Sequence, residues 1–303
     1  MNIPSLKNIC IVGGGAIGNE YSKILSHLNI NHQIISRSNY SKKNKIIKND
    51  IKNISAEDLS AYDGFIISVQ AQNNFEITKL LLEKTKCPIL VEKPIALNFT
   101  DHQILKDEFD RVHVALNRRK FQSAIKSKLI INEAKIVKAV VEVTEIQNRI
   151  KGSEEVINSW ALANTIHVID MALFISGLYD YDKKSQRIRR HSHFLRGEIC
   201  TLNKSHQIYF LDFTPHTGNW GIDIVTNLGR LILRPLEELR FQAPDNIKRQ
   251  ELALQPQNFK DGFLNNVLDF ISLNRNQFIS FEDYDYLMEV VKLFYKDDYD
   301  GKN

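Results

Sequence analysis

The sequence predicts an α/β domain built on a doubly wound parallel sheet, followed by an α+β domain with a large open, mainly antiparallel sheet. Three observations lead to this prediction. In the first third of the chain, short apolar runs alternate with helical patterns, and a glycine-rich turn follows the first apolar run. After Arg119 the pattern changes to longer runs in which apolar and polar residues alternate. Strands that alternate with helices favour a parallel sheet, whereas half-polar strands favour an antiparallel one.

The two halves of the chain therefore differ in the elements that we expect. In the first half these are the strand Asn8–Val12, the helix Ala16–Leu28, the strands His32–Ile35 and Gly64–Val69, the helix Phe75–Lys84, the strand Pro88–Val91, the helix Asp101–Phe109 and the strand Val112–Leu116. In the second half they are the helix Phe121–Asn132, the strand Lys135–Glu145, a helix within Glu155–Leu178, alternating strands between Arg187 and Phe241, and the helices Phe259–Leu273 and Phe281–Tyr295. We place the domain boundary so that residues 1–118 form the first domain and residues 119–303 the second.

Composition and charge exclude several classes of protein. Hydrophobic residues make up 43% of the 303 residues and charged residues 25%, which suits two globular domains. No apolar run is long enough for a transmembrane helix, and the N-terminus lacks the pattern of a signal peptide. Cys10, Cys87 and Cys200 lie far apart, without the spacing of a metal site or a disulfide framework. We therefore expect a cytoplasmic protein with no membrane partner and no metal.

One basic cluster raises the question of a nucleic-acid partner. Arg187, Arg189, Arg190 and His191 follow one another closely, but no aromatic stacking pattern or DNA-binding motif accompanies them. The net charge of the whole chain is only +4. We therefore predict that this cluster is a solvated strand or loop and that the protein has no nucleic-acid partner.

The glycine-rich turn carries a specific function. Residues 13–18 read Gly-Gly-Gly-Ala-Ile-Gly, which places Gly13, Gly15 and Gly18 in a G-x-G-x-x-G pattern between a strand and a helix. Such a turn uses its first glycine for the bend, its second for close approach of a pyrophosphate, and its third for packing of helix on strand. The first helical residues, Ala16 and Ile17, then offer unpaired N–H groups to phosphate oxygens. The sequence thus predicts a Rossmann domain that binds a dinucleotide.

The end of the second strand indicates which dinucleotide. Enzymes that use NAD place an acidic residue there to bind the adenosine ribose hydroxyls. This chain has Ser36, Arg37 and Ser38 instead, with Lys42 and Lys43 shortly after. An acid would repel a 2′-phosphate, whereas hydroxyl groups and a guanidinium would hold it. We therefore predict NADP(H) in preference to NAD(H).

Further motifs give the chain a resemblance to a known family. Glu92-Lys93-Pro94 follows one predicted strand and Asn117-Arg118-Arg119 follows the next. In the second half, the segment from Thr165 to Asp170 is similar to a His-x-x-Asp helix, with His167 and Asp170 in the defining places. With these motifs the chain resembles the glucose–fructose oxidoreductase / inositol dehydrogenase (Gfo/Idh/MocA) family over essentially its whole length.

This resemblance implies a function and an assembly. It implies hydride transfer at a secondary alcohol, or the reverse reduction, on sugars, cyclitols and related small polar molecules. It also implies a homodimer or homotetramer formed through the sheet of the second domain. Residues 1–118 would then bind the dinucleotide, and residues 119–303 would bind the substrate and form the oligomer. Lys93 would be the active-site lysine and His167 the acid/base candidate, with Glu92 and Pro94 shaping the loop under the nicotinamide.

The candidate site residues fall into three groups. The catalytic candidates are Lys93 and His167. The cofactor-binding candidates are Gly13, Gly15, Ala16, Ile17, Ser36, Arg37, Ser38, Val69, Gln70, Glu92, Lys93, Asn117 and Arg118. The substrate-binding candidates are Lys93, Trp160, Asn164, His167 and Asp170.

Simple chemistry supports the main candidates. Hydride transfer needs a group that takes or gives the hydroxyl proton, and a lysine just after a strand of the sheet lies where ligands bind. Its ammonium can hydrogen-bond the reacting oxygen and stabilise negative charge. On the helix of the second half, Trp160, Asn164 and His167 recur at i, i+4 and i+7, so they share one face. Asp170 could orient His167, bind substrate or act structurally.

The chain departs from the family in three places. Gln70-Ala71-Gln72 stands where the family has Thr-Pro-Asn, and Ser36 stands in place of the acid. Ala163 occupies the position, four residues before His167, where the family commonly has Asp. Two alternatives therefore stay open beside a sugar oxidoreductase. One is a reductase of an imine or a tetrapyrrole double bond, and the other is a ligand sensor that binds nucleotide without catalysis.

Overall fold

The structure is a computed structural model that divides into two compact units, which are described separately. It describes residues 5–37, 46–132, 134–146, 154, 156, 159, 161–180, 182–191, 194–200, 204–214, 218–245, 249–252, 254 and 258–293. The first unit comprises Met1–Asn117 and Gln257–Asp285, and the second comprises Arg118–Pro256 and Tyr286–Asn303. This grouping differs from a single cut after residue 118, because a late segment of the chain returns to the first unit.

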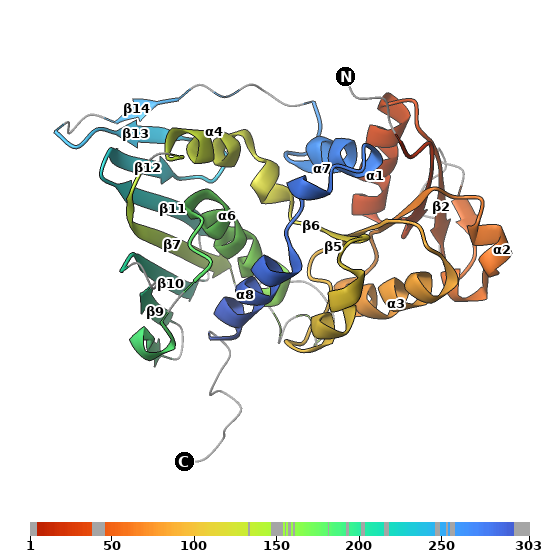
Figure 1. The fold of residues 1–303 in the computed structure, drawn as a ribbon, viewed down its shortest axis with the longest axis horizontal. Coiled ribbons are helices and arrows are strands. Elements are labelled where there is room, and N and C mark those ends of the chain that lie inside the picture. The colour runs from red at the N-terminus through yellow and green to blue at the C-terminus, as the bar shows by residue number, and fades with distance from the viewer. Residues whose placement is uncertain are drawn as a thin grey trace, which may run out of the picture. The chain divides into compact units, whose positions relative to one another are not determined.

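The first unit is built on a parallel six-stranded sheet in the order β3-β2-β1-β4-β5-β6. Figure 1 labels β2, β5 and β6 of this sheet. Its strands are β1 (Asn8–Val12), β2 (Asn31–Ser36), β3 (Ile46–Lys48), β4 (Gly64–Ile67), β5 (Ile89–Glu92) and β6 (Val112–Ala115). All neighbouring strands pair in parallel, which confirms the predicted doubly wound sheet. The strand order reverses at β1 and β4, and ligands bind beyond the carboxyl ends of the strands at such a point.

Helices and 3₁₀ turns complete the first unit. They are α1 (Ala16–His27), the 3₁₀ helix Ile51–Asn53, α2 (Ala56–Leu59), the 3₁₀ helix Ala71–Asn73, α3 (Asn74–Lys84), the 3₁₀ helices Asp101–Glu108 and Asn117–Lys120 (of which only Asn117 belongs to this unit), α7 (Phe263–Ile271) and the 3₁₀ helix Arg275–Gln277. The segment Asp101–Glu108 was predicted as an α-helix, but it forms a 3₁₀ helix in which only His102 and Leu105 are buried.

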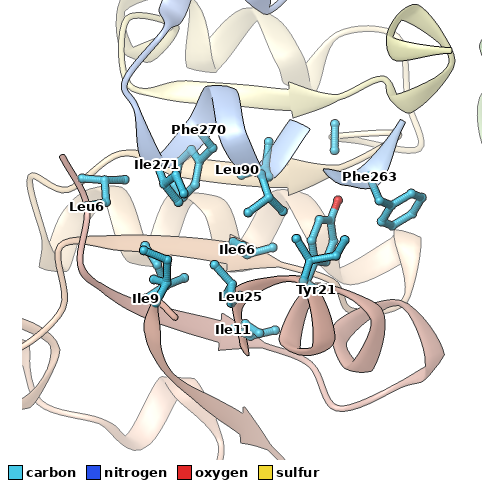
Figure 2. Packing of buried hydrophobic residues seen from close by; sticks show 14 of the residues in the cluster. Leu6, Ile9, Ile11, Tyr21, Leu25, Ile66, Leu90, Phe263, Phe270 and Ile271 are labelled. Atoms are coloured by element: carbon cyan, nitrogen blue, oxygen red, sulfur yellow. The ribbon is translucent and has the colours of Figure 1, made fainter. Parts of the chain in front are cut away.

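The late helix α7 belongs to the first unit because its apolar face completes the core there. Phe263, Val267, Phe270 and Ile271 are buried in the cluster that also contains residues of β1, β4, β5 and α1. Figure 2 shows Tyr21 of α1 beside Phe263, and their ring centroids are 5.2 Å apart. Burial of these apolar side chains stabilises the position of α1 against the sheet, and therefore also the glycine turn that precedes it.

The second unit is built on an eight-stranded sheet in the order β14-β13-β12-β11-β7-β10-β9-β8. Its strands are β7 (Ile136–Ile146), β8 (Arg187–His191), β9 (Phe194–Cys200), β10 (His206–Thr214), β11 (Asn219–Thr226), β12 (Gly229–Leu233), β13 (Arg240–Gln242) and β14 (Gln250–Glu251). The pair β7–β10 is parallel and the other neighbouring pairs are antiparallel. The predicted large, mainly antiparallel sheet is therefore confirmed.

Helices complete the second unit. They are α4 (Gln122–Ile130), a π-helix (Ala161–Thr165), α6 (Ile166–Ser176) and the 3₁₀ helix Lys183–Ser185, and α8 (Phe281–Lys292) is shared between the two units. Helix α6 is buried over nearly its whole length and packs on β7 and β11. It ends at Gly177, whose φ of 67° closes the helix with a left-handed residue. None of the described helices has the length and apolar character needed to cross a membrane.

Candidate functional site

A cavity of about 420 Å³ opens in the first unit at the carboxyl ends of the central strands. It lies at the topological switch point of the sheet, where doubly wound proteins bind their ligands. The predicted cofactor-binding residues that line it are Gly13, Gly15, Ala16, Ile17, Ser36, Arg37, Val69 and Gln70. Residues that the sequence did not single out line it too, namely Val12, Gly14, Ile35, Asn49, Asp50, Ile51, Lys52, Ser68, Asn73, Glu76 and Ile77.

The glycine turn has the geometry that a pyrophosphate needs. Gly13 adopts a φ of +113°, and a side chain there would overlap the Ser68 carbonyl. A side chain at Gly18 would overlap the Gly13 carbonyl oxygen, so this glycine is required for α1 to pack on the turn. At Gly15, in contrast, a Cβ would meet nothing within 4 Å, because this residue borders open space. The residues present therefore fit a dinucleotide whose phosphates lie against Gly15 and the start of α1.

The far end of the cavity carries both signs of charge. Ser36 is buried at the end of β2, Arg37 is exposed beside it, and both line the cavity. The segment after β3, the strand that pairs with β2, contributes Asp50 and Lys52 to the lining. The Asp50 Oδ1 accepts a hydrogen bond from the Lys52 backbone N–H at 3.0 Å, which holds this segment in a short turn. Ser38 lies outside the described residues.

Side chains of α1 and α3 hold the Glu92-Lys93-Pro94 segment by hydrogen bonds. The Tyr21 hydroxyl of α1 donates to Glu92 Oε1 at 2.6 Å. The Asn74 amide of α3 donates to the carbonyls of Glu92 and Pro94, both at 2.8 Å. Burial raises the pKa of Glu92, while the Tyr21 hydrogen bond and the positive charge of Lys93 act in the opposite direction. The backbone of this loop is therefore fixed on both sides of Lys93.

Four other predicted cofactor residues, Glu92, Lys93, Asn117 and Arg118, do not line the 420 Å³ cavity. Glu92 and Lys93 are partly buried at the end of β5, and two strands, β1 and β4, lie between β5 and β2 in the sheet. Asn117 is buried at the end of β6, and its amide donates to the Asp261 carbonyl at 3.3 Å. A nicotinamide lies at the opposite end of a dinucleotide from the adenosine, so residues on different strands are expected to meet its two ends.

Arg118 stands at the start of the second unit, on an aromatic platform. Its guanidinium lies 4.4 Å from the ring centroid of Trp220 and 5.7 Å from that of Phe121. Burial lowers the pKa of Arg118 to about 10, although the nearby charges of Glu237 and Glu145 raise it. Among the described residues, its Nε has no hydrogen-bond partner. Trp220 lies in β11, so a strand of the second sheet supports the Arg118 guanidinium.

His167 and Asn164 lie at the junction of two kinds of helix. His167 is in the first turn of α6 and is 7% exposed. Asn164 precedes it in the π-helix, and its amide Nδ2 donates to Glu145 Oε2 of β7 at 3.2 Å. The wider π-helical turn breaks the 3.6-residue period on which the predicted common face depended, and such turns often occur at functional sites. Trp160 lies outside the described residues.

Asp170 has a structural partner. It is completely buried, and both its carboxylate oxygens accept hydrogen bonds from the Arg119 Nε, at 2.7 and 2.9 Å. The Arg119 Nη2 also donates to the Tyr179 hydroxyl at 2.8 Å. A buried carboxylate that is paired in this way would be costly to unpair, and the role of Asp170 as a substrate ligand stays a prediction. Within the described ranges, no group of His, Cys, Asp and Glu could hold a metal ion.

Sequence reasoning missed two sets of residues for different reasons. Asn49, Asp50 and Lys52 follow β3, whose short Ile46-Ile47 core was not recognised as a strand. That pair of β-branched residues was the available signal, since the carboxyl end of any further strand reaches the same edge of the sheet. The contacts of Tyr21 and Asn74 with the Glu92 segment join residues far apart in the sequence, and no local signal marks them.

Comparisons with known proteins agree with this geometry. Residues 7–118 match the model of the GFO_IDH_MocA oxidoreductase family, an NAD-binding Rossmann fold. No curated protein matches the sequence. The whole chain is similar in fold to a dehydrogenase (MviM) from Clostridium difficile, with a TM-score of 0.75 at 17% identity over 95% of this chain and 98% of the other.

Two solved structures of sugar dehydrogenases have the same fold. UDP-N-acetylglucosamine 3-dehydrogenase GnnA from Acidithiobacillus ferrooxidans has a TM-score of 0.75 at 11% identity, over 94% of this chain and 95% of the other. Levoglucosan dehydrogenase, in complex with NADH and levoglucosan, has a TM-score of 0.74 at 15% identity, over 94% and 95%. At these identities the likeness establishes the fold of both units.

Proposed function

Because residues 7–118 carry the NAD-binding Rossmann domain of the Gfo/Idh/MocA oxidoreductase family, we propose that the protein transfers hydride between NADP(H) and a carbonyl or secondary alcohol of a sugar or sugar derivative. One observation gives this proposal its strongest support. The open cavity at Gly15 lies at the carboxyl edge of the same sheet whose fifth strand presents Lys93 on a fixed loop. A cofactor site and a candidate proton donor thus share one rigid edge. Two of the similar structures are sugar dehydrogenases, which supports the substrate class.

Lys93 is the proposed catalytic group. Its neighbours Glu92 and Pro94 are both held by the Asn74 amide, so the lysine backbone has little freedom. The ammonium carried on this fixed backbone can donate to the reacting oxygen and stabilise the charge that develops there. His167, on α6 of the second unit, is proposed as the second acid/base group and Asn164 as a substrate ligand.

The proposed preference for NADP(H) rests on Arg37. Arg37 is exposed next to Ser36, both line the cavity, and Lys52 adds a second cation to the lining. Two cations suit a 2′-phosphate. Asp50 also lines the cavity, and its negative charge opposes such a phosphate and favours NAD(H).

A single screen tests the function. NADPH consumption is followed by absorbance against panels of keto-sugars, imines and bilins, with wild type, Lys93→Ala and the control Lys23→Ala, whose side chain is exposed on α1. We expect turnover of a keto-sugar, a loss of at least about 100-fold in kcat for Lys93→Ala, and no change for Lys23→Ala. Turnover of imines or bilins alone would replace the proposed substrate class. Tight NADPH binding without turnover of any compound would favour a ligand sensor, for which Ala163 is the supporting feature.

We also propose that the protein is a homodimer or homotetramer through the second sheet. One face of β7 and β10 remains partly exposed within the second unit. Its apolar residues include Val140, Ile208 and Phe210. A wide sheet face with such apolar positions suits an interface between identical subunits. Light scattering coupled to size exclusion measures the mass, and a monomer at micromolar concentration would contradict the proposal.

The cytoplasmic location remains a prediction from the isolated cysteines.

A further inference from the structure

One buried carboxylate of the second unit has no role in the function proposed above. Glu145, near the end of β7, is 6% exposed and lies on the face of the sheet that α6 covers. Carboxylates are seldom buried to this extent without a task, since the charge loses its hydration. Its environment therefore indicates what it does.

Glu145 fixes the direction of the Asn164 amide. A carboxylate can only accept hydrogen bonds, so the Asn164 group that faces Glu145 Oε2 at 3.2 Å must be the Nδ2 donor. The Oδ1 acceptor of the same amide then points the other way. Among the residues that the structure describes, this oxygen has no hydrogen-bond partner, and the Asn164 side chain is only partly buried.

The position of this acceptor matches the proposed substrate site. Asn164 lies three residues before His167, at the π-helical turn that precedes α6. Glu145 also interacts electrostatically with Arg118, whose guanidinium lies on the Trp220 ring. Arg118 therefore supplies a favourable charge to the carboxylate that accepts from Asn164.

We propose that Glu145 is a positioning residue that presents Asn164 Oδ1 as an acceptor for a substrate hydroxyl. This inference rests on the proposed function and narrows its substrate class to compounds with a free hydroxyl donor at this point. An asparagine amide without a neighbour of fixed polarity could turn either way and would accept or donate with similar ease. An ionised carboxylate cannot donate, so only the orientation that directs Nδ2 towards Glu145 keeps the hydrogen bond and leaves Oδ1 as the acceptor.

A reciprocal exchange of the two side chains tests the proposal. Glu145→Gln removes the fixed polarity, because a glutamine amide can both donate and accept, and we expect KM to rise about threefold. Asn164→Asp places two carboxylates together, and we expect KM to rise at least about tenfold. The double variant Glu145→Gln/Asn164→Asp restores one donor and one acceptor and still offers an acceptor oxygen to the substrate. We expect its KM to return to within about threefold of wild type.

The kinetics use NADPH and the keto-sugar that the screen above identifies, and kcat is expected to change less than KM in every variant. Thermal unfolding of each variant shows whether it folds, and a merely structural role would change Tm without this pattern of rescue in KM. A double variant that folds but is no better than Asn164→Asp would overturn the proposal.

A second measurement needs no substrate. The side-chain amide protons of Asn164, assigned by NMR, are expected to shift between wild type and Glu145→Gln, because the acceptor changes from an anion to a neutral group. Unchanged amide resonances would overturn the pairing. If no sugar is turned over, the proposed function fails while these resonances still decide whether Glu145 holds Asn164.

Discussion

At the scale of single residues, the cavity of the first unit is lined by charges of both signs, which act in opposite directions on a bound phosphate. Arg37 and Lys52 line the cavity as cations, and Asp50 lines it as an anion whose Oδ1 also accepts from a backbone N–H. Arg37, the residue after β2, could be predicted from the sequence because it follows the strand next to the glycine turn. Asp50 could not be predicted, because its place in the cavity depends on the pairing of β3 with β2.

The first prediction concerns cofactor choice. Arg37→Ala is expected to weaken NADPH binding about 10- to 100-fold and NADH binding by less than about threefold, since only the 2′-phosphate loses a charge-assisted hydrogen bond. Asp50→Asn is expected to tighten NADPH binding by removing a like charge. Fluorescence titration with both cofactors measures these changes. Equal losses for the two cofactors in Arg37→Ala would contradict the assignment.

The second prediction concerns Tyr21, which is fully buried and donates to Glu92. Tyr21→Phe leaves Glu92 with one donor fewer in a buried place, and we expect a loss of about 1–3 kcal/mol in the free energy of unfolding. The hydrogen bond counteracts the effect of burial on the pKa of Glu92, so its loss should raise that pKa further. Urea unfolding at neutral pH measures the first effect. A variant as stable as wild type would show that the hydrogen bond contributes nothing net.

At the scale of elements, the site depends on a helix that comes late in the sequence. Helix α7 has one strongly apolar face, and its Phe263, Val267 and Phe270 lie in the core beside α1 and the parallel sheet. The periodicity predicted a helix here, but it could not indicate which sheet the helix would cover. Packing decided that, because the apolar surface of the Rossmann sheet was incomplete without it.

The third prediction follows from this packing. Phe270→Ala is expected to lower the free energy of unfolding by about 3–5 kcal/mol, because the ring is completely buried. Leu268→Ala serves as a control on the same helix, since Leu268 is 38% exposed, and its loss should be below about 1 kcal/mol. Chemical unfolding of both variants compares the two faces. Equal losses would mean that α7 does not pack as the structure shows.

At the scale of the whole molecule, stability depends on pH through a histidine in the first unit. His113 of β6 is 4% exposed and is stacked on Phe278 at a centroid distance of 4.6 Å. Burial, together with the charge of Arg275, lowers the pKa of His113 to about 4. In the unfolded chain the same group titrates near its ordinary value of 6.5. Below that value the unfolded state binds a proton that the folded state does not, so stability falls as the pH falls towards 4.

The fourth prediction states the size of this effect. Between pH 7 and pH 5, His113 is expected to remove about 2 kcal/mol from the free energy of unfolding. His113→Phe keeps an aromatic ring against Phe278 and should lose this contribution. Urea unfolding of both proteins at the two pH values measures the difference. If the variant loses as much stability as wild type on acidification, another group is responsible.

The sequence by itself determined the fold class of both units, the glycine turn and the residue types at the ends of β2 and β5. These follow from local rules, namely hydrophobic period, the sterics of glycine and the position of a residue after a strand. Only the tertiary structure decided the assignment of α7 to the first unit, the presence of Asp50 and Lys52 in the cavity, and the pairing of Asp170 with Arg119. It also decided that Glu145 meets Asn164. Each of these joins residues distant in the sequence, and such contacts depend on how apolar faces pack and where buried charges find partners.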